Sequence, residues 1–279
     1  MFGFLAKKNS PVQMVKDAYQ KGLAYMEAGD PERARLWLCR ADTIYSADDS
    51  TYEAVGEALT EDCSDRIGTL EEEPCLTNQL TAQVEEGAEE LEESQLRLWG
   101  LMSMARLAQL EKKLSALPGC RALGQLEMAV QLILRSFTAP ISGQEFGQLE
   151  ALRDELYELS DAKDYWNGGE IAVPGSASFQ VFDLNGMLVL LGLNAYLDSH
   201  LAYLVGEEEG APGPQTDIIP CALLPDYYLR TREGDIAQLP AVQAELARIQ
   251  EDFRFIHSRP ELSDAAQRIN DYLQLDLLA

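Results

Sequence analysis

The feature that most constrains the fold of this chain is the apolar segment 183–205, DLNGMLVLLGLNAYLDSHLAYLV. On a helix, at about 100° per residue, its leucines cover two adjoining faces and leave only a narrow polar strip. That strip consists of Tyr196, Ser199, His200 and Tyr203. A helix that is apolar over so much of its circumference is buried on most sides. We therefore expect 183–205 to be the central helix of a helical core.

A membrane span is the rival interpretation of this segment. A span needs about 20 mostly apolar residues, but the longest unbroken apolar run here is 187–191. Asn194 and Asp198 interrupt the second half, and an ionised Asp near the bilayer centre costs about 2.5–3.5 kcal/mol. No Lys or Arg flanks either end of the segment. We therefore expect a soluble protein with no membrane span.

Asp198 is a charged residue on a face of this helix that is otherwise largely apolar. It falls on the face that carries Leu184 and Leu191, and a buried carboxylate must be paired, hydrogen-bonded or protonated. One hypothesis places it as an acid in a pocket beside Asn194. The favoured alternative is a structural carboxylate bound to an arginine or to backbone N–H groups of another helix, because structural ion pairs also perturb carboxylates. His200 lies on the opposite side of the helix and cannot share a site with it directly.

The net charge of the chain limits the classes of molecule that we expect it to bind. The net charge is −25 in a chain of otherwise ordinary hydrophobic content, 46%. The acids concentrate in residues 48–93, where sixteen Asp and Glu accompany a single base, Arg66. This balance argues against direct nucleic-acid binding, which needs a basic face for the phosphates. An acidic surface instead attracts basic partners and speeds their encounter.

The chain carries little catalytic equipment. Its five cysteines are widely spaced with no C-x-x-C pair, and its two histidines have no H-x-x-x-H or H-E-x-x-H partner. Motifs for a nucleophile elbow, a P-loop and a dinucleotide-binding loop are also absent from the sequence. We therefore expect no disulfide framework, no metal and no cofactor, and the sequence favours a non-enzymatic protein.

Residues 11–46 form a predicted helical hairpin. Ser10-Pro11 and Asp30-Pro31 are each an N-cap followed by proline in the first helical position. The hairpin resembles a single tetratricopeptide repeat, and the residues at that repeat's spacing are Gly22, Tyr25, Gly29, Asp30, Ala34, Leu38 and Ala41. Ala18, Lys21 and Ser46 depart from its pattern. The resemblance implies that this segment binds another protein.

The rest of the chain predicts a mainly α protein built of antiparallel helical hairpins packed as a bundle. We expect one helix of about forty residues over 78–117, a helix opened by the capping box Ser142-x-x-Glu145, and a small β-hairpin near 170–182. The predicted division is an N-terminal helical region, 1–160, and a C-terminal region, 161–279, around 183–205. One compact domain is the alternative.

Two hypotheses for function follow. The first is a non-enzymatic cytoplasmic protein that binds a basic protein partner through its acidic surface, such as an adaptor or a bacterial immunity-type inhibitor. The MFGFLAKKNS start is too short for a secretory signal, which favours the cytoplasm. The partner-binding residues would be Tyr25, Glu85, Glu86, Glu89, Glu90 and Glu93.

The second hypothesis is a small-molecule or enzymatic pocket in the C-terminal half. Its lining would be Tyr165, Trp166, Asn194, Asp198, Tyr227 and Tyr228.

Overall fold

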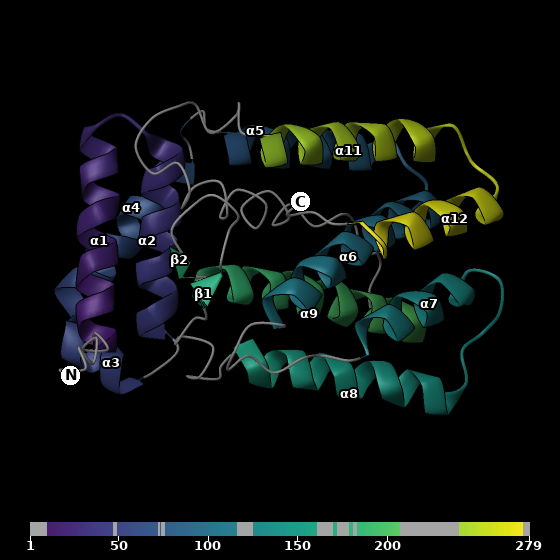
Figure 1. Ribbon diagram of the computed structural model, residues 1–279, viewed down its shortest axis with the longest axis horizontal. Helices are drawn as coiled ribbons and strands as arrows, with labels where there is room; N and C mark the ends of the chain where they lie inside the picture. Colours follow the sequence, from purple (N-terminus) through teal and green to yellow (C-terminus); the bar gives the residue numbers. More distant parts are fainter. Residues whose placement is uncertain are drawn as a thin grey trace, which may run out of the picture. The chain divides into compact units, whose positions relative to one another are not determined.

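The computed structural model describes residues 10–46, 49–71, 73, 76–115, 125–160, 170–171, 179–180, 183–206 and 240–275. These residues are mainly helical, as predicted, and contain eleven helices (Figure 1). The chain groups into two compact units, Met1–Gln79 and Leu80–Ala279. Each unit is described by itself.

The first unit consists of four helices. They are α1 (Pro11–Glu27), α2 (Pro31–Ser46), α3 (Asp49–Val55) and α4 (Glu57–Glu71). Both predicted N-caps are confirmed. The Gln13 backbone N–H donates to Ser10 Oγ at 3.3 Å, and the Arg33 N–H donates to Asp30 Oδ1 at 3.0 Å. The turn between α1 and α2 passes through Gly29 at φ 72°, a left-handed conformation that glycine adopts without strain.

Close packing of α1 on α2 forms the core of this unit (Figure 1). Gly22 is buried, and a Cβ at this position would lie 2.6 Å from Leu38 Cγ, so the two helices approach as only glycine permits. Ala34, Leu38 and Ala41 are fully buried on the facing side of α2. The hairpin over 11–46 is therefore confirmed as a structural element. Its kinship with a tetratricopeptide repeat stays a prediction.

The second unit contains the remaining elements. They are α5 (Leu76–Glu89), whose first turn precedes the unit boundary, α6 (Glu93–Ser115), α7 (Leu126–Ser136), α8 (Gly143–Ser160), β1 (Glu170–Ile171), β2 (Phe179–Gln180), α9 (Asp183–Val205), α11 (Pro240–His257) and α12 (Leu262–Tyr272). The capping box before α8 is confirmed, because the Ser142 N–H donates to Glu145 Oε2 at 2.8 Å and the Glu145 N–H donates to Ser142 Oγ at 3.3 Å. In the part of the chain that the structure describes, none of the helices combines the length and apolar character of a membrane span.

The core of the second unit lies around α6 rather than around α9 alone. Every residue from 97 to 109 is buried, and α7, α9, α11 and α12 all pack on this helix. Helix α9 has the predicted bounds and packs against α6 and α8. The sequence did not indicate α6 as central because Arg97, Ser103 and Arg106 interrupt its apolar pattern. These polar side chains are buried and hydrogen-bonded instead.

Two boundary predictions differ from the structure. The forty-residue helix over 78–117 is wrong, because the chain turns at 90–92 and divides it into α5 and α6. The Gln95 side chain accepts the Glu92 backbone N–H at 3.1 Å and so caps the second helix. The division at residues 160 and 161 also differs from the observed units, because α9 packs closely on α6 and α8.

The predicted β-hairpin near 170–182 is represented by two residue pairs only. Glu170 lies opposite Gln180 and Ile171 opposite Phe179, in antiparallel register. The residues between β1 and β2 lie outside the described part, so the hairpin stays a prediction.

Candidate functional site

The predicted acidic docking surface is exposed on α5. We define the α5 acidic face as Glu85, Glu86 and Glu89, which are all exposed. None of the three forms an ion pair with another described residue. Of the neighbouring glutamates, Glu90 lies near His257, with 3.9 Å between Glu90 Oε2 and His257 Nε2, and Glu92 pairs with Arg259 at 2.6 Å.

The other two predicted partner-binding residues have different surroundings. Glu93 is exposed in the first turn of α6, where the helix dipole favours a negative charge. Tyr25 is half-buried in the first unit, and the Arg33 guanidinium lies 5.8 Å from its ring centroid. Tyr25 thus belongs to a different compact unit from the α5 acidic face.

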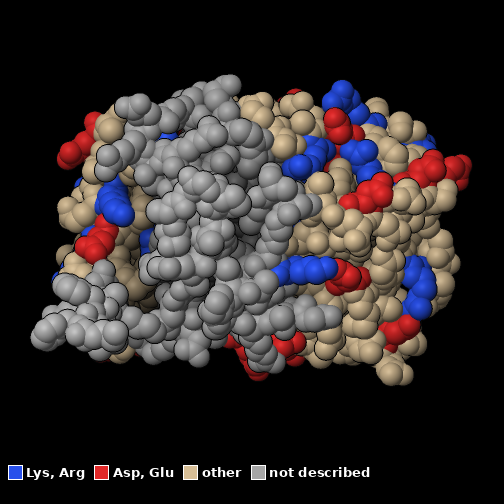
Figure 2. Space-filling model, viewed as in Figure 1, with Lys and Arg blue, Asp and Glu red and all other residues tan. Residues whose placement is uncertain are grey.

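The net charge is not spread evenly over the second unit. On the face that Figure 2 shows, acidic and basic side chains alternate in small groups between larger areas of uncharged residues. The second unit contains several ion pairs, such as Lys112 with Glu127 at 2.7 Å and Arg135 with Glu145. The three exposed glutamates of the α5 acidic face differ from these paired charges, because they have no cationic partner among the described residues.

Asp198 is exposed rather than buried. Two-thirds of its side chain, 67%, is accessible to solvent, and its carboxylate lies 3.4 Å from Arg153 Nη1 on α8. The buried face of α9 holds Leu193, Tyr196, Leu197, His200 and Leu201. The expected orientation of the helix, with Asp198 on a buried apolar face and Tyr196 and His200 on the polar strip, is therefore wrong. The leucines of α9 did not distinguish its two sides, because they cover most of its circumference.

Asp198 and Asn194 nevertheless line one hollow, as the pocket hypothesis requires. The hollow has a volume of about 440 Å³, and its walls are Arg153, Asp154, Tyr157, Glu158, Asn194 and Asp198. Asn194 Oδ1 is buried there without a hydrogen-bond donor from the protein. The hollow is polar and open, with three carboxylates and one arginine. The other predicted lining residues, Tyr165, Trp166, Tyr227 and Tyr228, lie outside the described residues.

A second cavity lies between α5, α6 and α11, and the sequence analysis did not anticipate it. We call it the Trp99 cleft. It has a volume of about 300 Å³ and is lined by Gln83, Val84, Trp99, Ile249, Gln250, Phe253 and Arg254. The Trp99 and Phe253 rings lie 5.4 Å apart, centroid to centroid, at 48° to each other. The open space depends on the packing of three helices that are not all neighbours in sequence, which a local sequence pattern does not specify.

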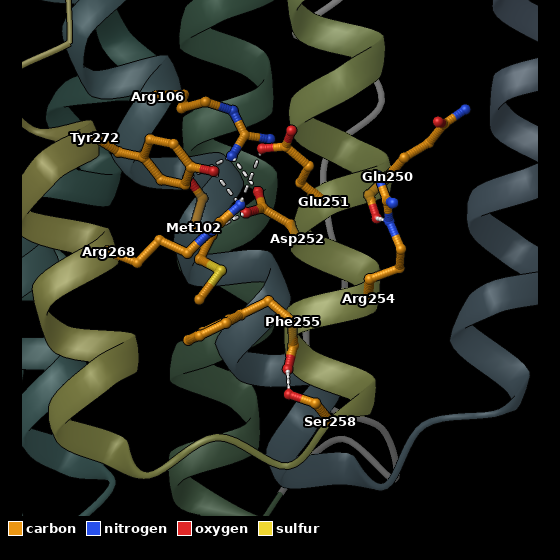
Figure 3. Close-up of polar contacts among 10 residues, drawn as sticks. All are labelled: Met102, Arg106, Gln250, Glu251, Asp252, Arg254, Phe255, Ser258, Arg268 and Tyr272. Carbon is orange, nitrogen blue, oxygen red and sulfur yellow. Dashed lines mark hydrogen bonds and ion pairs between the residues drawn. The ribbon is translucent and has the colours of Figure 1, made fainter.

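A buried ion cluster on the opposite side of α11 holds the second unit together. Asp252 is fully buried, and its carboxylate accepts hydrogen bonds from Arg106, Arg268 and Tyr272, each at 2.6 Å (Figure 3). The Arg106 guanidinium also lies 4.8 Å from the Tyr272 ring centroid. Three donors satisfy this carboxylate in a packed interior, so the arrangement joins α6, α11 and α12 and is structural.

A second buried polar group lies between α6 and α9. Arg97 is buried, and its guanidinium lies 4.4 Å from the Phe137 ring centroid and 4.3 Å from that of Tyr203. It donates to Ser136 Oγ at 3.1 Å. His200 is fully buried nearby, and burial, followed by the charge of Arg97, lowers its pKa to about 3. His200 is therefore neutral at physiological pH, and neither of its ring nitrogens has a hydrogen-bond partner.

Neither a metal-binding cluster nor an activated thiol is found among the described residues. In the described ranges, no three His, Cys, Asp or Glu side chains converge on a position for a metal ion. The Cys63 thiol is fully buried, and burial raises its pKa to about 12, so it is not an activated nucleophile. The described residues also form the exposed α5 acidic face and the two cavities described above.

Comparison of this chain with protein-family models, with curated proteins and with solved structures finds no match. The function is therefore argued from the geometry of these sites.

Proposed function

We propose that this protein is a non-catalytic binding protein that docks a basic protein partner on the α5 acidic face. The observation that carries the proposal is the run of three exposed glutamates, Glu85, Glu86 and Glu89, on one helix without a cationic partner among the described residues. Like charges at this spacing repel each other, so the run does not stabilise the isolated helix. A cationic partner would relieve that repulsion on binding.

The surroundings of the α5 acidic face suit this role. Trp99 and Phe253 pack beneath α5, where Gly87 brings the helix backbone close to the Phe253 ring. The two aromatic rings therefore support α5 from below, while its three glutamates stay exposed. The α1–α2 hairpin, which resembles a protein-binding repeat, would add a second contact surface. An adaptor or an immunity-type inhibitor of a basic protein fits this combination, and a cytoplasmic setting suits it.

The test compares two triple variants that remove the same charge. E85Q/E86Q/E89Q neutralises the α5 acidic face, and E53Q/E61Q/D65N neutralises three exposed acids in the first unit. Each is used to capture proteins from a lysate of the source cell at low and high salt, followed by mass spectrometry. A carboxyl-to-amine cross-linker is applied to the wild type.

We expect a basic protein to be captured at low salt by the wild type and by the control variant, and lost at high salt because exposed charges are screened. The α5 variant should not capture it, and the cross-link should map to Glu85, Glu86 or Glu89. Equal capture by both variants, or cross-links elsewhere, would refute the α5 acidic face as the docking surface.

The hollow at Asp198 is a second candidate, favoured by the buried Asn194 Oδ1 that lacks a donor. Its three carboxylates and the exposed Tyr157 ring suit a small organic amine. The D198N variant tests this role, because Asp198 is exposed and its replacement should leave the protein folded. Unchanged binding of a panel of polyamines by D198N would exclude Asp198 as their ligand.

A further inference from the structure

The Trp99 cleft has the composition of a small-molecule site. Four of its seven lining residues are apolar, namely Val84, Trp99, Ile249 and Phe253. Its volume of about 300 Å³ lies at the lower end of the range for ligand pockets, about 300–1,000 Å³. The walls come from α5, α6 and α11. The cleft is therefore shaped by packed helices.

The inner wall of the Trp99 cleft consists of two aromatic rings that pack closely against each other and against α5. Trp99 is 2% exposed, and Phe253 lies against it. A Cβ on Gly87 would lie 3.1 Å and 3.3 Å from two Phe253 ring atoms and 3.5 Å from Trp99, so the α5 backbone supports both rings. A flat or branched hydrocarbon group fits such a wall, because aromatic rings prefer offset or tilted contacts with other apolar groups.

Two side chains at the cleft, Trp99 and Arg254, carry N–H groups that donate to no described side chain. Trp99 Nε1 is buried and unpaired. Arg254 Nε donates to the Gln250 backbone carbonyl at 3.2 Å, and within the described chain no carboxylate pairs with its guanidinium. Arg254 and Gln250 point away from the Asp252 cluster, on the opposite side of α11 (Figure 3). An arginine without a carboxylate partner among the described residues is notable in a chain with a net charge of −25.

None of the described lining residues is acidic, so these residues offer donors and a positive charge to a ligand. We propose that the Trp99 cleft binds a small hydrophobic carboxylic acid, with the carboxylate on Arg254 and the hydrocarbon body against Trp99 and Phe253. A guanidinium binds a carboxylate through paired N–H donors, which also orients the ligand. This site is separate from the α5 acidic face and takes a ligand of opposite charge.

The test titrates the full chain with naphthalene-2-carboxylate, octanoate and phenylacetate by calorimetry, with 2-naphthylmethanol as the uncharged counterpart of the first acid. Nitrogen-15 NMR follows the Trp99 indole cross-peak, which the W99F variant identifies. We expect at least one acid to bind and shift this cross-peak, and the alcohol to bind about tenfold more weakly, since it lacks the charge-assisted bonds to Arg254.

Three variants decide the assignment. R254Q should weaken acid binding about tenfold, while R135Q, which removes an exposed arginine on α7, should leave it unchanged. Q250W should block the cleft from its exposed rim. The proposal is overturned if no acid binds, if the alcohol binds as tightly as its acid, or if R254Q binds like the wild type. E85Q/E86Q/E89Q should still bind the acid, so failure here is distinguishable from failure of partner docking.

Discussion

Asp252 and Asp198 carry the same charge in opposite environments, and their replacement should have very different costs. Asp252 is fully buried between Arg106 and Arg268, whereas Asp198 is mostly exposed beside Arg153. We expect D252N to lower the free energy of unfolding by about 3–5 kcal/mol, because it removes the buried carboxylate charge that pairs with Arg106 and Arg268. D198N should cost less than about 1 kcal/mol, as is usual for exposed ion pairs. Urea denaturation measures both, and similar values for the two variants would contradict the structural role of Asp252.

His200 should make stability depend on pH in a range where most groups do not titrate. Its pKa is about 3 in the folded protein, because burial disfavours the charged ring, and near 6.5 when unfolded. The unfolded chain therefore binds more protons below pH 6.5, and stability is full above that pH and lost as the pH falls toward 3. Between pH 7 and pH 5 we expect a loss of about 2 kcal/mol.

The matched variants for this effect are H200F and H257Q. The first removes the buried ring that must stay neutral, and the second removes the exposed histidine. Urea denaturation at pH 7 and pH 5 should give a smaller difference for H200F and an unchanged difference for H257Q. An equal pH dependence in H200F and the wild type would contradict the burial of a neutral His200.

Individual residues were the hardest feature to predict from this sequence. The burial of Arg106 and Asp252 depends on a contact between positions 146 apart in the chain. A local signal existed, since Asp252 lies within the inward stripe of Ile249, Phe253 and Ile256. A charge in an apolar stripe predicts a buried partner but does not identify it. For Asp198, the apolar character of α9 on nearly all sides left its orientation undetermined.

At the scale of the elements, close helix packing can be tested with two glycines of the first unit. A Cβ on Gly22 would lie 2.6 Å from Leu38, while a Cβ on Gly68 of α4 would have no neighbouring atom within 4 Å. We expect G22A to destabilise by about 1–3 kcal/mol, because the added methyl group overpacks the α1–α2 contact. G68A should stabilise by about 0.5–1 kcal/mol, because alanine favours a helix interior. Thermal and urea denaturation measure the change in the free energy of unfolding for each variant, including its sign. A stabilising G22A would mean that α1 and α2 are not in close contact.

Helix ends were predicted well where a side chain specifies them. The caps at Ser10, Asp30 and Ser142 are local signals, and the structure confirms each. The break between α5 and α6 was missed because its N-cap residue is Glu92, which is not a preferred N-cap, although Gln95 three residues later accepts the Glu92 N–H. Gln95 also donates to the Ile256 carbonyl at 2.8 Å, a contact that depends on α11. The apolar periodicity continues from α5 into α6 without a break. The position of this boundary therefore depends on tertiary contacts rather than on the local pattern.

At the scale of the whole molecule, each compact unit has a core of its own, and the two should respond separately to core mutations. The first unit is built on Gly22, Ala34 and Leu38, and the second on α6 and the Asp252 cluster. Hydrogen exchange should show that G22A speeds exchange in residues 10–71 only, whereas D252N speeds it in α6, α11 and α12. Because the two substitutions lie in different compact units, we expect the double variant to be additive within about 0.5 kcal/mol. A single cooperative transition in which each mutation speeds exchange throughout the chain would instead show that the units fold as one domain.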